Sequence, residues 1–371
     1  MHILVMVHDF SPGGAERICL RLAAQWARQG HRITVACGTA VGPLRKFIRP
    51  EMALVEFGIK RASGSRIALG NRLARSCLTL KPDIIFLPGN YYFDAAVAIK
   101  ARMRARSPLL IGKLSNTIIR PGKNRVQQYA YNLAIRVKSR FLNHIVAMSP
   151  GLADEARAFI PSHVPMSIVS QPILDSIEEA SMDHRSTFPR GRRRFVAAGR
   201  LASQKNFRLL IDAVSEMRRR EDIIVDIYGD GPLKEQLIAQ IGARGLNDVI
   251  SLRGYVDSLL PQLGDADGFI LSSDFEGFPS VVVEAMAAGV PVVATDCSPA
   301  MQDILFDHST NIVIPPRDRG ALTAALERLA TMPRPDMRKA KAGAGAYTLD
   351  ASARAYLSLF AGLLQGHGAR A

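Results

Sequence analysis

Short apolar runs alternate with amphipathic segments along the first half of the chain. The apolar runs predict strands at 2–8, 32–37, 53–57, 83–89, 109–114, 145–149 and 167–171. The segments between them predict helices at 14–29, 66–80, 94–106, 124–142 and 151–159. This alternation is typical of βαβ units, which build a parallel sheet.

Residues 175–194 are polar, charged and irregular, and they predict a linker. After them the alternation resumes, with strands expected at 195–199, 223–228, 249–253, 268–272, 291–295 and 312–314. Helices are expected at 206–218, 232–243, 257–264, 280–288, 320–331 and 350–365.

The predicted fold class is therefore α/β, with two Rossmann-like doubly wound domains that face each other across a cleft. We place the first domain at 1–174 and the second at 195–349, and we expect a C-terminal helix within 350–371 to pack back on the first domain. Ligands of such sheets bind at the carboxyl ends of the strands, so the cleft is the expected site.

Length and composition agree with two folded domains. The chain has 371 residues, 48% of them hydrophobic, which excludes extensive disorder. The four cysteines lack metal-binding spacing, so we expect buried thiols in a reducing compartment. The opening MHILVMVHDF is expected to be a first strand rather than a leader, and no apolar run reaches the length of a membrane span.

The charge is divided unevenly. Residues 1–172 carry 25 Lys and Arg against 8 Asp and Glu, a net charge of +17, whereas the remainder carries 23 against 25, a net charge of −2. A basic half predicts an anionic partner, which could be membrane lipid, nucleic acid or a phosphorylated substrate.

The predicted helix 124–142 is amphipathic. Arg125, Arg136 and Arg140 share one face. The opposite face carries the apolar residues that we expect to pack on the sheet, namely Val126, Ala130, Leu133, Val137 and Phe141.

Glycines mark the first candidate site. Gly13 and Gly14 stand where the first strand turns into a helix, so backbone N–H groups could approach an anion there. A plain tight turn would explain the same residues. The stretch is not GxGxxG and no acidic residue ends the second strand, so a dinucleotide fingerprint is absent.

Three strand ends of the second domain carry further candidates. Arg200 and Lys205, in AAGRLASQKNF, could neutralise a diphosphate, although solvated surface charges are the simpler alternative. A nucleoside could lie against the turns IYGDGP and RGYVD, although such turns are common in α/β proteins. They contain Gly229, Asp230, Tyr255 and Val256.

The stretch FEGFPSVVVEAMAAGVPVVAT holds two carboxylates in apolar surroundings. Glu276 lies on the loop after a buried strand, and Glu284 lies just over one turn into a helix for which Ser280 is the predicted N-cap. Such carboxylates could accept hydrogen bonds from sugar hydroxyls. The alternative is one loop Glu and one helix Glu without a ligand. The DAD at 265–267 runs into a buried strand, so we interpret it as strand entry rather than a metal site.

Together these motifs resemble the retaining glycosyltransferases of family 4, which have the glycosyltransferase B architecture of two Rossmann-like domains. The resemblance lies in PGGAE, GRLASQKN, GDGP and the Glu, seven residues, Glu signature formed by Glu276 and Glu284. It spans most of the chain in the family's order, and it is more specific in the second domain than in the first.

The resemblance implies a role for each matching position. Glu276, Arg200 and Lys205 would form the catalytic set, with the two cations on the donor diphosphate and Glu276 on the donor sugar, while Glu284 would bind the ribose. The other implied donor-binding residues are Gly13, Gly14, Gly229, Asp230, Tyr255, Val256, Gly277, Phe278, Pro279 and Ser280. The family uses a nucleotide sugar and generally no metal or other cofactor; UDP is the commonest nucleotide, with GDP and ADP as alternatives.

One departure from the family concerns the acceptor side. Many relatives carry a His after the strand equivalent to 109–114, and this chain has none there. The acceptor-side candidates are therefore Ser115, Asn116, Arg120 and His8, and we name no general base. The family implies front-face displacement, in which the leaving phosphate helps to deprotonate the acceptor.

The expected function is transfer of a sugar to a glycan or to a polyprenyl-diphosphate-linked acceptor, in surface polysaccharide or glycolipid synthesis. The basic first domain predicts a peripheral location at the inner, cytoplasmic face of the membrane. A sugar-nucleotide 2-epimerase of the same fold is one alternative. A basic nucleic-acid-binding protein is another, although 6% aromatic residues and the lack of a known motif argue against nucleic acid as a partner.

Overall fold

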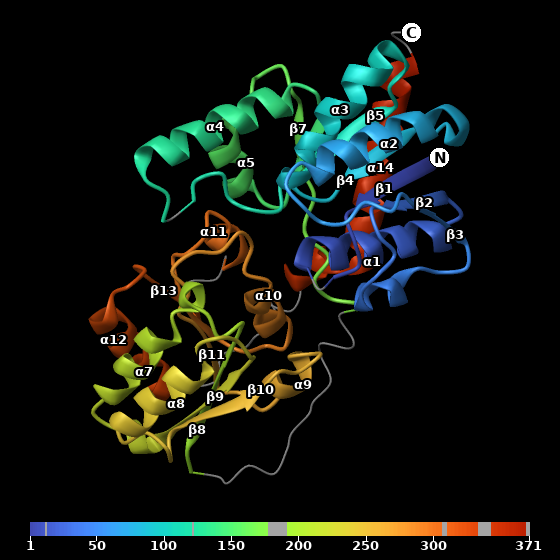
Figure 1. Ribbon diagram of the computed structural model, residues 1–371. Coiled ribbons are helices and arrows are strands. Elements are labelled where there is room, and N and C mark those ends of the chain that lie inside the picture. The colour runs from blue at the N-terminus through green and yellow to red at the C-terminus, as the bar shows by residue number, and fades with distance from the viewer. Residues whose placement is uncertain (12, 121, 177–190, 306–309, 333–342, 369–371) are drawn as a thin grey trace. The chain divides into compact units, whose positions relative to one another are not determined.

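The computed structural model describes residues 1–371 except 12, 121, 177–190, 306–309, 333–342 and 369–371 (Figure 1). The chain divides into two compact units. Unit 1 comprises Met1–Pro172 and Tyr347–Ala371, and unit 2 comprises Ile173–Ala346. Each unit contains one sheet, so the predicted α/β class with two Rossmann-like units is confirmed.

Unit 1 is built on a seven-stranded sheet in the order β3-β2-β1-β4-β5-β6-β7, in which all neighbours are parallel. The strands are β1 (His2–Val7), β2 (Arg32–Cys37), β3 (Met52–Glu56), β4 (Ile84–Leu87), β5 (Leu109–Lys113), β6 (His144–Ala147) and β7 (Met166–Ile168). The sheet order reverses between β1 and β4, where doubly wound folds bind their ligands.

Helices cover both faces of this sheet (Figure 1). They are α1 (Gly14–Arg28), α2 (Ser65–Leu80), α3 (Phe93–Met103), α4 (Arg125–Ser139), α5 (Pro150–Arg157) and α14 (Leu349–Gly368). Alternate residues of β1 enter two separate cores, with Ile3 and Val5 on the α1 side and Leu4 and Met6 on the α2 side. Burial on both faces explains why this strand is apolar throughout.

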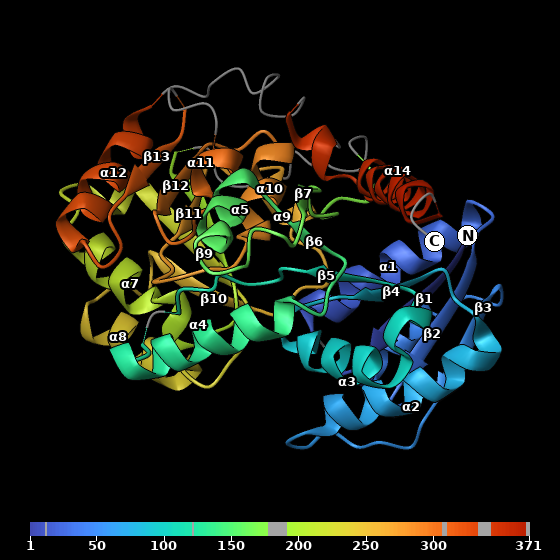
Figure 2. The same ribbon diagram turned by 90° about the horizontal axis from the view of Figure 1, so that it is seen from above.

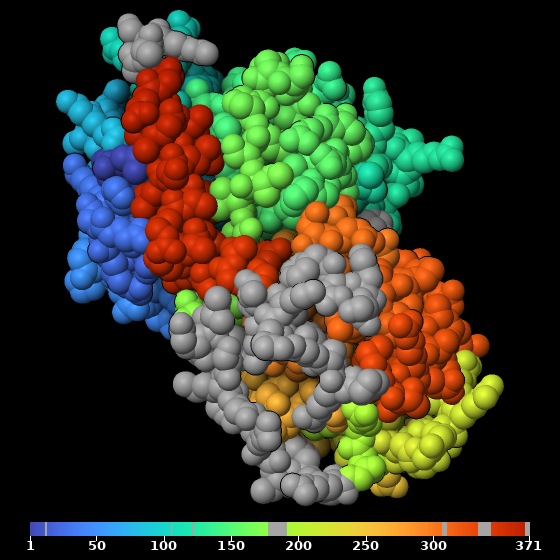
Figure 3. Space-filling view, turned by 180° about the vertical axis from the view of Figure 1, so that it is seen from behind, coloured from blue at the N-terminus to red at the C-terminus, as the bar shows by residue number. Residues whose placement is uncertain are grey.

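The C-terminal helix α14 packs beside α1 and completes the core of unit 1 (Figures 2 and 3). The rings of Tyr356 and Phe360 lie edge-on to Trp26, at centroid distances of 5.8 and 5.4 Å. The indole Nε1 of Trp26 donates a hydrogen bond to the Ala353 carbonyl over 3.2 Å. The last helix is therefore an integral part of the first unit.

Unit 2 repeats the arrangement with six parallel strands in the order β10-β9-β8-β11-β12-β13. The strands are β8 (Arg193–Ala198), β9 (Ile223–Tyr228), β10 (Ile250–Gly254), β11 (Gly268–Leu271), β12 (Val292–Thr295) and β13 (Ile312–Ile314). The helices are α7 (Phe207–Ser215), α8 (Lys234–Ala243), α9 (Leu260–Leu263), α10 (Ser280–Ala287), α11 (Met301–Ile304) and α12 (Arg319–Thr331).

The cysteines, the linker and the lengths of the helices were also predicted from the sequence. All four cysteines are buried free thiols, as predicted. The predicted linker 175–194 lies mostly outside the described residues, and its end was wrong: Arg193 and Arg194 begin β8, because the Arg194 side chain is buried on Asp226 at 2.7 Å. Among the described residues, no helix combines the length and the apolar character needed to cross a bilayer.

The predicted orientation of α4 was wrong. Val126, Leu133 and Val137 were expected to pack on the sheet, opposite Arg125, Arg136 and Arg140, but all six residues are exposed. The inward side of α4 carries the buried Ile135 and the partly buried Tyr131, which packs against the α2-side core. Apolar residues thus occupy both sides of this helix, and the sequence periodicity alone could not tell which side faces the core.

Candidate active site

The centre of the candidate site in unit 2 is an ion pair between two predicted catalytic residues. Glu276 follows β11 on the loop that leads into α10, and only 8% of its surface is exposed. Its Oε1 atom lies 2.6 Å from Lys205 Nζ and accepts a second hydrogen bond from Ser273 Oγ at 2.7 Å. Its Oε2 atom lies 3.4 Å from Gln204 Nε2. A buried carboxylate is thus neutralised by one cation and held in a fixed orientation.

The loops after the neighbouring strands β8 and β11 are fastened to each other. The Asp274 amide donates to the Gln204 carbonyl at 2.8 Å, and Gln204 Nε2 donates to the Phe275 carbonyl at 2.9 Å. Asn206 Nδ2 donates to Asp274 Oδ1 at 2.8 Å. These bonds join the loop that carries Lys205 to the loop that carries Glu276. The two side chains are therefore held close together by the backbone that carries them.

The turn after β9 packs directly on the loop after β8. Gly229 has φ +142°, and a Cβ atom there would lie 1.9 Å from the Gly199 carbonyl oxygen. The Leu201 amide donates to the Asp230 carbonyl at 2.9 Å. Only glycine fits this conformation and this close approach, which is the physical reason for the GDGP motif.

The other predicted donor-binding residues line the same edge of the sheet of unit 2. Arg200 and Asp230 are exposed, and the Asp230 carboxylate accepts a hydrogen bond from the Gly231 amide at 2.8 Å. Tyr255 is exposed just after β10, with its hydroxyl 3.3 Å from Asp257 Oδ1, and Val256 is half-buried. The structure thus brings the ends of β8, β9, β10 and β11 together.

Glu284 lies in the second turn of α10 and is half-buried. The prediction that Ser280 caps this helix was wrong. Pro279 is the N-cap residue and Ser280 is the first helical residue, with no capping hydrogen bond from a side chain. Gly277, Phe278 and Pro279 form the turn before α10, and the Gly277 carbonyl accepts a hydrogen bond from Ser298 Oγ at 3.1 Å.

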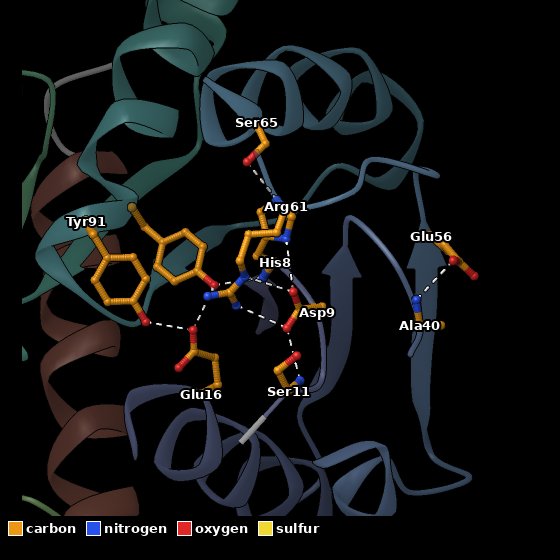
Figure 4. A network of polar contacts seen from close by, with 10 residues as sticks. His8, Asp9, Ser11, Glu16, Ala40, Glu56, Arg61, Ser65 and Tyr91 are labelled. Atoms are coloured by element: carbon orange, nitrogen blue, oxygen red, sulfur yellow. Dashed lines mark hydrogen bonds and ion pairs between the residues drawn. The ribbon is translucent and has the colours of Figure 1, made fainter. Parts of the chain in front are cut away.

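In unit 1, the glycine turn before α1 is shaped by a buried carboxylate (Figure 4). Gly13 is the N-cap of α1, and a Cβ atom on it would lie 2.4 Å from Glu16 Oε2, whereas Gly14 faces open space. Glu16 Oε1 accepts hydrogen bonds from the hydroxyls of Tyr91, at 2.7 Å, and Tyr92, at 3.3 Å. A side chain on Gly13 would crowd the Glu16 carboxylate, whereas the space beside Gly14 is open.

His8, an acceptor-side candidate, is almost fully buried next to this turn (Figure 4). Its Nε2 atom lies 2.8 Å from Ser65 Oγ and its Nδ1 atom 3.4 Å from Asp9 Oδ2, and burial lowers its pKa. Arg61 donates two hydrogen bonds to Asp9, at 2.9 and 3.1 Å. With both ring nitrogens occupied, His8 is held in position by its neighbours rather than presented to solvent.

Two of the other acceptor-side candidates gather around Tyr131 of α4. Arg120 lies over the Tyr131 ring, 4.8 Å from its centroid, and donates to its hydroxyl at 3.1 Å. Asn90 Nδ2 donates to the same hydroxyl at 3.1 Å, and Ser115 Oγ donates to Asn90 Oδ1 at 3.3 Å. Asn116 is exposed on the following loop. These residues form a polar cluster at the ends of β4 and β5.

Two side chains that hold Glu276 in place were not predicted from the sequence. Ser273 and Gln204 fix the carboxylate of Glu276, and both lie in strand-end motifs where a polar residue in an apolar context is the available signal. Lys113 was also missed. It is fully buried at the end of β5, donates to Gln171 Oε1 at 2.7 Å, and burial lowers its pKa to about 8.

Comparisons with known proteins identify a family for both parts of the chain. Residues 12–173 match the model of Glycosyltransferase Family 4, and residues 192–332 match that of Glycosyl transferases group 1. The chain is 34% identical to an alpha-D-kanosaminyltransferase of Streptomyces kanamyceticus over 36% of each chain. It is 30% identical to a Campylobacter jejuni N-acetylgalactosaminyltransferase, whose name gives a diphospho-undecaprenol substrate, over 32% of each chain.

Other similarities extend over the whole chain. The lipopolysaccharide core biosynthesis glycosyltransferase LpsE of Rhizobium meliloti is 25% identical over 95% of this chain and 97% of its own. The galactosyltransferase WaaB has a TM-score of 0.74 at 16% identity, covering 96% and 98% of the two chains. Anabaena HepE with UDP and glucose has a TM-score of 0.70 at 17% identity, covering 100% and 99%.

The solved structures establish the fold, and the two family models together cover both units. They divide the chain where the described units divide, with one model on unit 1 and the other on unit 2. The two parallel sheets match the architecture of these solved structures. The chain is a member of the family 4 glycosyltransferases and has the glycosyltransferase B fold.

Proposed function

We propose that the protein is a retaining, metal-independent glycosyltransferase that uses a nucleotide-diphosphate sugar, with UDP as the nucleotide. The observation that carries the proposal is the Lys205–Glu276 pair at 2.6 Å, held at the meeting point of the loops after β8 and β11. It sets a hydrogen-bond acceptor for sugar hydroxyls beside a cation for a phosphate. Similarity to LpsE and to HepE, solved with UDP and glucose, supports the donor class.

In the proposed reaction, the bond between the anomeric carbon and the diphosphate oxygen breaks while the acceptor oxygen bonds to the same face of that carbon. The proton of the acceptor hydroxyl moves to the leaving phosphate. Lys205 and Arg200 stabilise the charge that develops on this phosphate, which is the role that a metal ion has in other transferases. Glu276 orients the sugar, and Glu284 binds the ribose.

The proposed acceptor is a glycan or a polyprenyl-diphosphate-linked saccharide, with unit 1 as the acceptor-binding unit at the inner face of the cytoplasmic membrane. The name of the Campylobacter jejuni relative supports a lipid diphosphate of this class. The excess of 17 positive charges in residues 1–172 supports attraction to an anionic membrane surface.

The first test is thermal stabilisation by UDP, GDP and ADP in the presence of a chelator. We expect UDP to raise the Tm of the wild type and to have much less effect on Glu284→Ala. If no nucleotide stabilises the wild type, the donor assignment is wrong. If only added metal restores stabilisation, metal independence is wrong.

A second test determines the anomeric configuration of the product and whether the reaction needs an acceptor. NMR of the product made from an α-linked donor should show an α-linkage, whereas a β-linkage would contradict retention. Release of a free, altered sugar without any acceptor would identify the chain as a sugar-nucleotide 2-epimerase instead.

A further inference from the structure

Helix α4 exposes a row of large apolar side chains. Val126 is 77% exposed, Tyr129 71%, Leu133 50% and Val137 45%. Their spacing of three or four residues puts them on one side of the helix, and we call this row the α4 stripe. Ile119 on the preceding loop is exposed as well. Contiguous exposed apolar rows on soluble proteins usually mark an interaction surface.

The other side of α4 is firmly attached to unit 1. Gln128 Oε1 accepts a hydrogen bond from the Arg120 amide at 2.9 Å, and Lys138 Nζ lies 2.6 Å from Asp94 on α3, which packs beside α4 (Figure 2). Ile135 is buried in the core. The stripe is therefore presented by a helix that is already anchored, and turning the helix inward would break these contacts.

The charged side chains that α4 exposes beside the stripe are basic. Arg125, Arg136 and Arg140 are exposed beside it, and α4 contains no acidic residue. The chain from 95 to 153 carries 11 Lys and Arg and not one Asp or Glu. An apolar row with basic flanks matches a bilayer surface, where acyl chains lie beneath anionic headgroups.

A second copy of the chain fits this face poorly. A two-fold interface through α4 would bring two copies of this basic surface together, so the like charges of Arg125, Arg136 and Arg140 would have to be accommodated in one interface. A bilayer that contains anionic lipid avoids this repulsion and neutralises the arginines instead.

We propose that α4 lies in the headgroup region of an anionic bilayer, with its stripe inserted among the lipids and its arginines on lipid phosphates. This inference rests on the proposed membrane association of the acceptor-binding unit and assigns that association to one helix. The insertion is shallow and reversible, because a single amphipathic helix in the interface buries its apolar side only at the boundary between headgroups and acyl chains.

The test is co-sedimentation of the full chain with vesicles of phosphatidylcholine alone or mixed with phosphatidylglycerol. The stripe variant combines Val126→Ser, Leu133→Ser and Val137→Ser. The matched control combines Ile67→Ser and Leu78→Ser, which remove exposed apolar side chains from α2 of the same unit. We expect the wild type and the control to bind the mixed vesicles, and the stripe variant to bind them at least about tenfold more weakly.

The flanking charges give an independent prediction. Replacing Arg125, Arg136 and Arg140 by Gln should weaken binding about fivefold for each charge, and added salt should weaken wild-type binding in the same direction. In Tyr129→Trp, the new fluorophore should shift to the blue on mixed vesicles, because Trp26 is buried in the core and contributes a constant signal.

Three results would overturn the proposal: no binding of the wild type to mixed vesicles, equal binding of the stripe variant, or a stripe-dependent dimer in sedimentation velocity without vesicle binding. The Tm of the stripe variant and its shift by UDP check the fold and the donor site separately. Loss of the UDP shift in the wild type, with vesicle binding intact, would defeat the donor assignment and leave α4 as the membrane-binding element.

Discussion

The two units have the same strand order around their first strand, but their polar clusters differ in kind. In unit 2, Lys205 and the buried Glu276 meet between the loops that follow β8 and β11. In unit 1, the buried carboxylates of Asp9 and Glu16 are held by Arg61 and by two tyrosine hydroxyls. The first cluster is the one we propose to meet the donor, and the second joins the end of β1 to residues of later loops and helices.

The comparison separates the net charge of a unit, which lies on its surface, from the paired charges of its buried clusters. Unit 1 contains the strongly basic half of the sequence, yet its buried network balances charge with charge. The excess lies on surface helices such as α4. Unit 2 is close to neutral, and its candidate site still presents cations at the strand ends. Net charge therefore indicates the partner of a surface, while local pairing indicates the chemistry of a site.

The largest expected effect is on the rate of glycosyl transfer, and it distinguishes Glu276 of unit 2 from Glu16 of unit 1. Glu276→Ala should lower kcat/KM for glycosyl transfer by about 10²–10³, because a group that orients the donor sugar is lost. Glu16→Gln keeps an acceptor for the tyrosine hydroxyls and should change the rate only a few-fold. Steady-state kinetics with the identified donor measure both variants, and equal losses would contradict the distinction.

The next largest effect is on the free energy of unfolding, and it distinguishes Gly229 of unit 2 from Gly14 of unit 1. Gly229→Ala should lower the free energy of unfolding by about 2 kcal/mol or more, since its φ is positive and the new Cβ would collide with the Gly199 carbonyl. Gly14→Ala faces open space and should leave stability nearly unchanged. Urea denaturation provides the comparison. A stable Gly229→Ala protein would mean that the turn after β9 adapts more easily than its packing indicates.

The buried network of unit 1 predicts a pH dependence. Burial raises the pKa of Asp9, but hydrogen bonds from Arg61 and Ser11 outweigh this and lower it to about 2. Because the folded pKa lies below the unfolded value of about 3.9, the stabilisation is present above that value and is lost as the pH falls toward 2. Arg61 is half-exposed, so we expect about 1 kcal/mol from this interaction.

Asp9→Asn should therefore be less stable than the wild type at pH 7, and the difference should shrink as the pH falls from about 5 toward 2. Asp154→Asn, which removes an exposed pair with Arg157, is the control and should change stability very little. A difference between Asp9→Asn and the wild type that stays constant across this range would contradict the assigned cause. Denaturant titrations at each pH supply the measurement.

The smallest effect concerns helix caps in unit 2. Ser280→Ala should change the free energy of unfolding by less than about 0.5 kcal/mol, because the Ser280 hydroxyl does not cap α10. Asp318 accepts a hydrogen bond from the Ala321 amide at 2.9 Å and caps α12, so Asp318→Ala should cost about 1 kcal/mol. If both variants lose the same stability, the N-cap assignment of α10 is wrong.

The strands could be predicted because each is a short apolar run with a turn on either side, and every expected strand appears within a few residues. The grouping of the candidate donor-site residues in unit 2 could be predicted because most of them stand at strand ends, which a parallel sheet brings to one edge. Their pairing could not, since Lys205 and Glu276 are 71 residues apart and either could have faced solvent. The outward side of α4 could not be predicted either, because its tertiary contacts, not its periodicity, decide which apolar side is buried.

The packing of α14 also affects the order in which the protein can fold during synthesis. The core of unit 1 receives Tyr356 and Phe360 from the end of the chain, after the whole of unit 2 has been made. Unit 2 is continuous in sequence and can fold as soon as it leaves the ribosome. Unit 1, although its first strand is made first, lacks the ring contacts of Trp26 with Tyr356 and Phe360 until the helix that begins at residue 349 has been made.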